Sequence, residues 1–155
     1  MANRIQAEHD ASTAMTLTAA SLASSTAGVG RQSTMISNVD DGQLIQIYYK
    51  ITTGTSPTAN KTITIYLIKG DDPSSSNIRT DNAGASDAGL TVVTARQIDV
   101  ITTDATSNHT YYGSCIIRNP GPEWGIAIVQ DTGVALNATG SNHAFRYVVE
   151  NQEVQ

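Results

Sequence analysis

The chain has 155 residues, of which 39% are hydrophobic and 15% charged, and its formal net charge is −5 at pH 7. This length predicts a single domain with one core, and a negative charge without a basic cluster argues against nucleic-acid binding, which needs Lys and Arg to neutralise phosphates. No apolar stretch approaches the roughly 20 residues of a membrane-spanning helix, and the N-terminus lacks the hydrophobic segment of a signal peptide. We therefore expect a protein that is made in a cytoplasm and has no membrane partner.

Residues 1–14 are predicted to form an N-terminal arm, and residues 15–155 the single domain. Small and polar residues predominate in the arm, and Ile5 is its apolar anchor. So little apolar surface cannot hold an element in place, so we expect the arm to become ordered on a neighbouring protein by strand addition. Met15, Leu17 and Leu22 follow the arm directly and are expected to contact the same partner. Deleting residues 2–14 should then leave the melting temperature almost unchanged.

The first half of the domain alternates short apolar segments with turn residues. Residues 15–22 favour a strand over a short helix, and residues 30–39 predict a second strand. The clearest strands are residues 44–51 and 61–69, since each places a row of Ile, Leu or Tyr side chains on one face. The turn-forming residues between these two strands predict a hairpin.

The second half begins with residues 70–89, a polar segment predicted to be a loop, which at this length is usually functional or mobile. Residues 90–101 predict two short strands or one bent strand. Residues 111–117 form a further predicted strand, in which Gly113 indicates a bulge or a close backbone approach. The chain closes with two core strands in residues 124–150, joined by a surface loop.

About eight strands at regular spacing, with no amphipathic helix, predict an all-β fold: a two-sheet antiparallel sandwich, jelly-roll-like, with an extended N-terminal arm. An immunoglobulin-like sandwich is the alternative, and the Cys pair that many such domains contain is absent. The strand pattern alone does not decide between the two strand orders.

No residue pattern predicts catalysis, a cofactor or a metal site. His9, His109 and His143 are far apart, and none has a second His or Cys at metal-ligand spacing. Cys115 is the only cysteine, so an internal disulfide is impossible, and we expect a small buried side chain there. Substituting Cys115 or His143 should therefore alter stability at most.

Tyr48 and Tyr66 are predicted to point outward, because each opposes the Ile face of its strand. If the two strands are neighbours, these rings lie side by side on an outer surface. Such a pair suits a subunit contact, which we favour, or a glycan-binding platform.

Several stretches carry a resemblance to a known family. They are residues 21–25, SLASS; 30–34, GRQST; 50–60, KITTGTSPTAN; and 124–147, which contains DTGVALNATGSNH. Together they resemble small virion proteins of tailed bacteriophages and prophages. The resemblance spans residues 21–147 and consists of turn and strand motifs, and it brings no catalytic residues. Similar small β-sandwich proteins act as decoration or cement proteins on phage heads.

The resemblance implies a non-enzymatic virion structural protein, made in the host cytoplasm and located on the capsid surface. We expect it to bind the major capsid protein and copies of itself, as a trimer, and to stabilise the shell by burying surface across subunit joints. No cofactor is expected. The alternative is a receptor- or glycan-binding β-sandwich module of a tail or head appendage.

Overall fold

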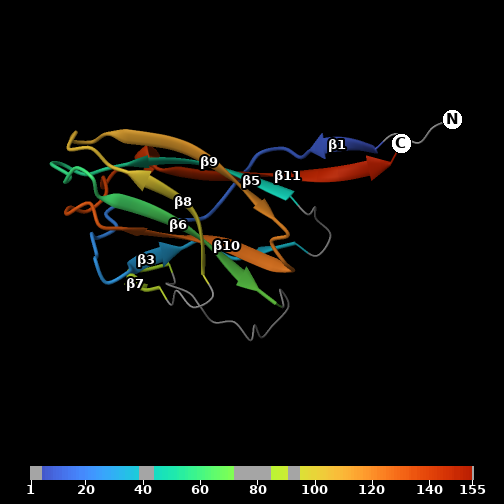
Figure 1. Ribbon diagram of the computed structural model, residues 1–155, viewed down its shortest axis with the longest axis horizontal. Helices are drawn as coiled ribbons and strands as arrows, with labels where there is room; N and C mark the ends of the chain where they lie inside the picture. The colour runs from blue at the N-terminus through green and yellow to red at the C-terminus, as the bar shows by residue number, and fades with distance from the viewer. Residues whose placement is uncertain (1–4, 39–43, 72–84, 91–94, 155) are drawn as a thin grey trace.

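The computed structural model describes residues 5–38, 44–71, 85–90 and 95–154. Two antiparallel sheets pack face to face, as Figure 1 shows, and the described chain adds only a short 3-10 turn, η1 (Gly140–Asn142). No helix of this part of the chain is long and apolar enough to cross a membrane. The prediction of an all-β, two-sheet sandwich is confirmed.

The first sheet has the strand order β1-β11-β5-β9, and β2 also pairs with β11. Its strands are β1 (Ile5–His9), β2 (Thr13–Ala14), β5 (Leu44–Thr52), β9 (Thr110–Arg118) and β11 (Ala144–Val154). The second sheet has the order β7-β3-β10-β6-β8, and β4 also pairs with β10. Its strands are β3 (Val29–Gln32), β4 (Ile36–Ser37), β6 (Thr62–Gly70), β7 (Ala88–Gly89), β8 (Arg96–Thr102) and β10 (Glu123–Gln130).

The strand order is that of a jelly roll. Strands β5, β9 and β11 lie in the first sheet and β6 and β10 in the second, so the chain crosses between the sheets at most of its connections. An immunoglobulin-like sandwich would instead join several sequence neighbours as hairpins within one sheet. The predicted jelly-roll-like arrangement is therefore the observed one.

The predicted hairpin between residues 44–51 and 61–69 is wrong, because β5 and β6 lie in different sheets. Both strands carry an apolar face, and in the sandwich these two faces pack against each other. The connection between them crosses one end of the fold, where Gly54 and Pro57 are buried. A backbone hydrogen bond from Thr53 to His109 holds the start of this crossing.

Residues 15–22 form no regular strand, contrary to the prediction, because this segment carries the chain from the first sheet to the second. The amide of Met15 donates to Phe145 in the first sheet, and the carbonyl of Thr16 accepts from Thr34 beside the second. The side chains still alternate from Met15 to Ala19, with Met15 and Ala19 buried and Leu17 partly buried between them, and Leu22 is buried after a turn at residues 20–21. Their periodicity is that of a strand, but the sheet ladder is missing.

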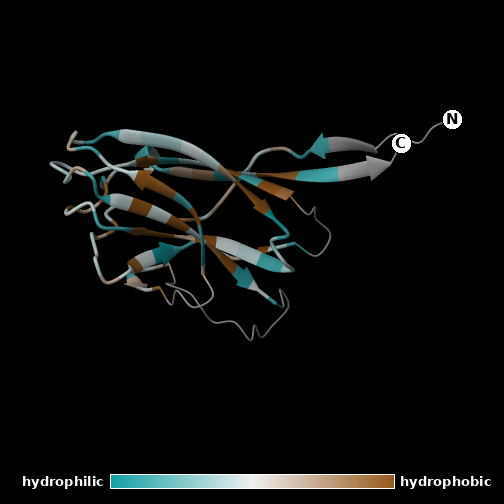
Figure 2. Cartoon of the chain, in the orientation of Figure 1, coloured by the Kyte–Doolittle hydropathy of each residue, from teal (hydrophilic) through white to brown (hydrophobic). Residues whose placement is uncertain are grey.

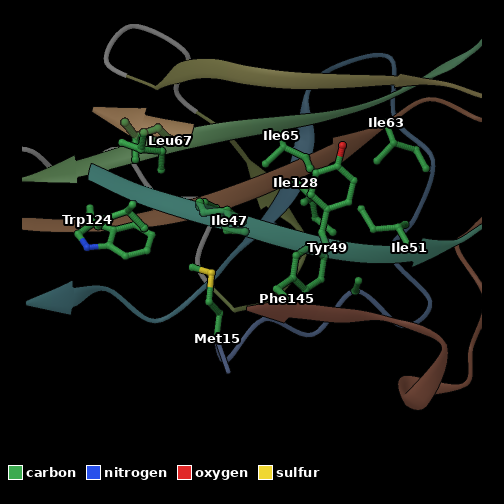
Figure 3. Close-up of a cluster of buried hydrophobic side chains, with 14 of the residues drawn as sticks. Met15, Ile47, Tyr49, Ile51, Ile63, Ile65, Leu67, Trp124, Ile128 and Phe145 are labelled. Atoms are coloured by element: carbon green, nitrogen blue, oxygen red, sulfur yellow. The ribbon is translucent and has the colours of Figure 1, made fainter. Parts of the chain in front are cut away.

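The main core fills the space between the sheets. The strands of both sheets carry hydrophobic segments, as Figure 2 shows. Trp124 packs edge-on against Tyr147 with ring centroids 5.2 Å apart. Figure 3 shows Met15 and Phe145 beside Ile47 and Tyr49 of β5, with the β6 residues Ile63, Ile65 and Leu67 beyond them. Each buried Ile or Leu contributes roughly 1.5–3 kcal/mol relative to an exposed one. The fully buried Ile and Leu members are Leu22, Ile45, Ile47, Ile51, Ile63, Ile65, Leu67, Ile117, Ile126 and Ile128.

A second, smaller cluster lies on the outer face of the second sheet. Ile68 and Ala127 are buried there under Leu90, and Tyr66 and Val129 pack against them. Strand β10 is thus buried on both faces, which explains why residues 124–129 are continuously apolar instead of alternating. The predicted loop of residues 70–89 includes β7, but residues 72–84 and 91–94 lie outside the described part of the chain.

The N-terminal arm is extended, and two parts of it pair with β11 of the same chain. Strand β2, whose two residues are exposed, pairs with Arg146 and Tyr147 at the edge of the first sheet. Strand β1 pairs with residues 150–154, and the last β11 residue to pair with β5 is Glu150. Beyond the sandwich, β1 and the end of β11 therefore form a two-stranded terminal ribbon, which projects from one end of the molecule in Figure 1.

Candidate interaction surface

The outer face of the first sheet is the most exposed apolar surface among the described residues. Tyr112 is 76% exposed, Ile116 54% and Tyr48 43%. In the register of β5 and β9, Tyr48 lies opposite Ser114, so both Tyr112 and Ile116 are its diagonal neighbours. Such neighbours are within reach of aromatic side chains. The three side chains therefore form one patch.

The register of three strands arranges this face in four rows, each with one residue from β11, β5 and β9. We call these residues the open face. Hydrophobic, aromatic and cationic side chains predominate, and Glu150 is the one acidic member. From one end to the other the rows are Ala144, Lys50, Tyr112; Arg146, Tyr48, Ser114; Val148, Gln46, Ile116; and Glu150, Leu44, Arg118.

The charges of the open face oppose those of the whole chain. Three cationic side chains lie on it, Lys50, Arg118 and Arg146, although the chain carries −5 overall. Arg118 and Arg146 are exposed and form no ion pair among the described residues. Tyr and Arg are the residue types enriched at protein interfaces, so the composition of this face suits a protein contact.

The predicted pairing of Tyr48 with Tyr66 is wrong. Tyr48 lies on the open face, whereas Tyr66 lies on the other sheet and packs against the cluster around Ile68. The two strands were expected to be neighbours because they follow each other in sequence. In a jelly roll the chain crosses to the opposite sheet instead.

The other predicted interface residues lie in the domain or in the terminal ribbon. Met15 and Leu22 are buried in the chain's own core, so they offer no surface to a partner, and Leu17 packs against the same core. Their apolar character is explained by the crossing between sheets. Ile5 lies in β1, where its backbone partner is Val154.

Sequence reasoning missed Ile116 and the exposed arginines Arg118 and Arg146. The signal was present in residues 110–118, where Tyr112, Ser114, Ile116 and Arg118 alternate with the inward-facing residues. Gly113 interrupts the run of large side chains in this segment and makes its period of two less apparent. The structure shows an unbroken register between β5 and β9 across Gly113, so the close-approach alternative is the correct one and there is no bulge.

The three histidines lie in separate places. His143 is buried: its Nδ1 accepts from the amide of Thr52 at 3.4 Å, and its Nε2 lies 2.8 Å from the carbonyl of Asn137. A carbonyl only accepts, so Nε2 carries the proton and the ring is neutral. Burial lowers the pKa of His143. These contacts give it a structural role.

His109 lies on a surface loop, with Nδ1 2.7 Å from a carboxylate oxygen of Asp104 and its ring against Tyr111. Hydrogen bonds, first from the amide of Thr106 and then from His109, lower the pKa of Asp104. His9 is exposed in the terminal ribbon. Among the described residues, no group of three or more His, Cys, Asp or Glu side chains is placed to hold a metal ion.

Cys115 lies near the seam between edge strands β8 and β9. Burial, and then the charge of Asp99, raise the pKa of its thiol to about 11. The same carboxylate accepts a hydrogen bond of 2.5 Å from the hydroxyl of Tyr49, which crosses from β5 in the other sheet. A thiol with a raised pKa is a poor nucleophile, and the Tyr49–Asp99 bond links the two sheets at their edge.

Loops from three of the stretches that carry the family resemblance meet at the end of the sandwich opposite the terminal ribbon, whereas residues 30–34 pair with β10. The Thr52 hydroxyl donates to the carbonyl of Asn142, and the amide of Asn137 donates to Thr52. Gln130, fully buried, donates to the carbonyls of Leu22 and Val134. These contacts hold the loops at that end together, and most residues of the open face lie outside the four stretches.

Comparison with known proteins identifies no family. No protein-family model matches the chain, and no curated protein matches it. Among solved structures it is similar to CorA, described as a surface-associated copper-binding protein important in copper acquisition by Methylomicrobium album BG8, with 11% identity, a TM-score of 0.40, and 92% of this chain and 93% of that chain covered. It is also similar to part of dimeric latent PorU from Porphyromonas gingivalis, with 11% identity, a TM-score of 0.38, and 99% of this chain and 13% of that chain covered. Similarities this low support no argument about function.

Proposed function

We propose that the protein is a non-enzymatic structural protein of a phage virion, made in the host cytoplasm, that binds the major capsid protein on the head surface and stabilises the shell. Two things support the proposal: the resemblance of the stretches within residues 21–147, and the terminal ribbon. The ribbon is the observation on which the mechanism depends. Neither the open face nor the histidines suggest a reaction.

The terminal ribbon is suited to strand addition. A two-stranded ribbon is only marginally stable alone in water, and within the described residues β1 pairs on one side only, with β11. The other side presents backbone amides and carbonyls without a strand partner in that part of the chain. An extended segment of a capsid subunit would satisfy them, adding backbone hydrogen bonds without requiring a pocket.

Co-sedimentation with empty phage heads tests the proposal. The probe is the head of the phage or prophage whose genome encodes the chain, prepared without this protein. We expect saturable binding of the full chain and an increase in the temperature at which the heads open. Deleting residues 2–9 removes β1 and should weaken binding at least tenfold, about 1.4 kcal/mol. Absence of binding by the full chain would refute the capsid role.

A second candidate function is a receptor- or glycan-binding module. The observation that favours it is the diagonal proximity of Tyr48 and Tyr112 on an exposed face, since aromatic rings provide stacking surfaces for sugars. A glycan array separates the two functions. Saccharide-specific binding that is lost in Tyr112→Ala, together with no affinity for empty heads, would favour the glycan function over ours.

A further inference from the structure

The open face has the symmetry that a contact between two identical copies requires. A two-fold contact uses the same patch on both subunits, so residue i meets residue j and residue j meets residue i. The three strands of the open face are arranged symmetrically, with β5 in the middle and β11 and β9 on its two sides. If a second copy is placed over the first around an axis along β5, β11 of each copy covers β9 of the other.

This arrangement matches the chemistry of each row. Glu150 and Arg118 flank Leu44 in one row, so Glu150 of each copy meets Arg118 of the other. Val148 and Ile116 flank Gln46 in the next row, so two aliphatic contacts form. Each dimer would thus contain two contacts between opposite charges and two contacts between apolar side chains.

The remaining rows are compatible with the same contact. Arg146 meets Ser114, a hydrogen-bond acceptor, and Tyr112 meets Ala144, which leaves space for the ring. On the axis itself Tyr48 meets its own copy, and aromatic pairs are favourable. Lys50 is the one residue that would face a like charge, the Lys50 of the other copy. It lies at the end of the face, where its Nζ donates to the carbonyl of Ser141 at 2.7 Å.

We propose that the open face is a homodimer interface, in which a second copy of this chain covers the first around a two-fold axis along β5. The inference does not depend on the virion role, and it differs from the trimer expected from the sequence, since this face is self-complementary. Stacked sheets cross at about 30°, so the two middle rows of the two copies superpose best and the end rows are displaced from each other. In the displaced end row, the long side chains of Glu150 and Arg118 can still reach each other.

The expected affinity is modest. Twelve side chains form the open face, four from each of three strands, whereas a stable standard interface uses about 20–30 residues a side. We therefore expect a dissociation constant in the micromolar range, with monomer and dimer in rapid exchange. Salt should weaken the pair because its ion pairs lie at the rim.

The test uses charge reversal across the pair. Glu150→Arg and Arg118→Glu should each raise the dissociation constant at least tenfold, measured by sedimentation equilibrium on the full chain. Mixing the two variants in equal amounts should restore the dimer, because one copy then carries two cations and the other two anions at the paired positions. An ion pair within one chain cannot produce this rescue.

Matched controls lie on the other sheet. Arg96→Glu reverses an exposed charge on β8, and Val100→Ser removes an aliphatic side chain that is 39% exposed there; neither should change the dimer. Ile116→Ser, on the open face, should weaken the dimer without any change of charge. This variant therefore tests the interface even if a reversed charge disturbs folding.

A wild-type chain that stays monomeric to several hundred micromolar would overturn the proposal, as would a trimer unaffected by Ile116→Ser, or a mixture of the two charge variants that remains monomeric. The measurement uses no phage heads, so its outcome is separate from that of the capsid-binding experiment.

Discussion

Gly113 lies at a position where no side chain fits. A Cβ built there would be 2.1 Å from the hydroxyl oxygen of Tyr49 and 2.3 Å from its ring. The two residues are partners in the β5–β9 register, so the Tyr49 ring passes over Gly113 to reach Asp99. The absence of a side chain on β9 is therefore what permits the bond between the sheets.

We predict that Gly113→Ala destabilises the protein by about 1–3 kcal/mol, the usual cost of overpacking, since Tyr49 must move and its hydrogen bond to Asp99 is lost. Urea denaturation followed by circular dichroism measures the change. Gly89→Ala is the matched control, because no atom of the described residues lies within 4 Å of a Cβ there. Equal effects of the two substitutions would show that Tyr49 does not occupy this space.

His143 makes stability depend on pH in a predictable direction. Burial lowers its pKa in the folded protein, whereas in the unfolded chain a histidine has a pKa of about 6.5. Above that value both states are neutral and the contribution to stability is complete. As the pH falls below about 6.5 and towards the lowered value, only the unfolded state binds the proton, so the free energy of unfolding decreases, by at most about 1.4 kcal/mol per pH unit.

The prediction is checked by urea denaturation between pH 8 and pH 5. His143→Gln retains an acceptor and a donor but does not titrate, so its unfolding free energy should fall less steeply than that of the wild type over this range. If His143→Gln keeps the wild-type slope, the ring is not held neutral as described.

At the scale of single elements, β1 and β2 differ in what they stabilise. Strand β2 pairs with Arg146 and Tyr147, in the part of β11 that also pairs with β5, while most of β1 pairs beyond the last contact of β11 with β5. The sequence places both in one arm, residues 1–14. The structure instead divides the arm into a part that extends the first sheet and a part that projects.

Deleting residues 2–9 should therefore change the melting temperature by less than about 2 °C, since most of β1 pairs beyond the last contact of β11 with β5. Deleting residues 2–14 removes β2 as well and should lower the melting temperature further, by roughly 2–4 °C per kcal/mol lost for a protein of this size. This replaces the negligible change expected from the sequence, because β2 pairs with β11 in the first sheet. Differential scanning calorimetry at one protein concentration compares the two. A large loss with the shorter deletion would mean that the ribbon is part of the cooperative core.

The elements that the sequence predicts well are those whose signal is local. Residues 44–51 and 61–69 alternate cleanly because one face of each strand is buried, and the structure has β5 and β6 there. Which sheet each strand joins is not a local property. Adjacent strands usually pair, and that expectation fails here because two equally apolar faces are better buried against each other.

The same reason limits prediction of the interaction surface. Tyr48 was identified as outward-facing from its own strand, but its neighbours come from β9, which is distant in sequence. Tyr66 has an equally outward position and is nevertheless packed against Ile68. Whether an outward residue is exposed depends on which loop covers the sheet, and periodicity does not contain that information.

At the scale of the whole molecule, the two sheets are unequally covered. The second sheet is buried on its inner face by the main core and on its outer face around Leu90, whereas the first sheet exposes its outer face. Most neighbouring strands are also far apart in sequence, so long loops must close before the sheets form, and we expect slow folding in milliseconds to seconds. The second sheet should be the most stable part.

Native-state hydrogen exchange tests this hierarchy along the whole chain. Strand β10 pairs on both sides and is buried on both faces, so its amides and those of β6 should exchange only through global unfolding, with rates that rise with denaturant. Amides of β1, in a ribbon paired on one side in the described chain, should exchange at least a hundredfold faster, about 2.7 kcal/mol less protected, and without denaturant dependence. Strand β2 should lie between them. Equal protection of β1 and β10 would place the terminal ribbon in the same cooperative unit as the core, and an incoming capsid strand would then have no weakly held edge to join.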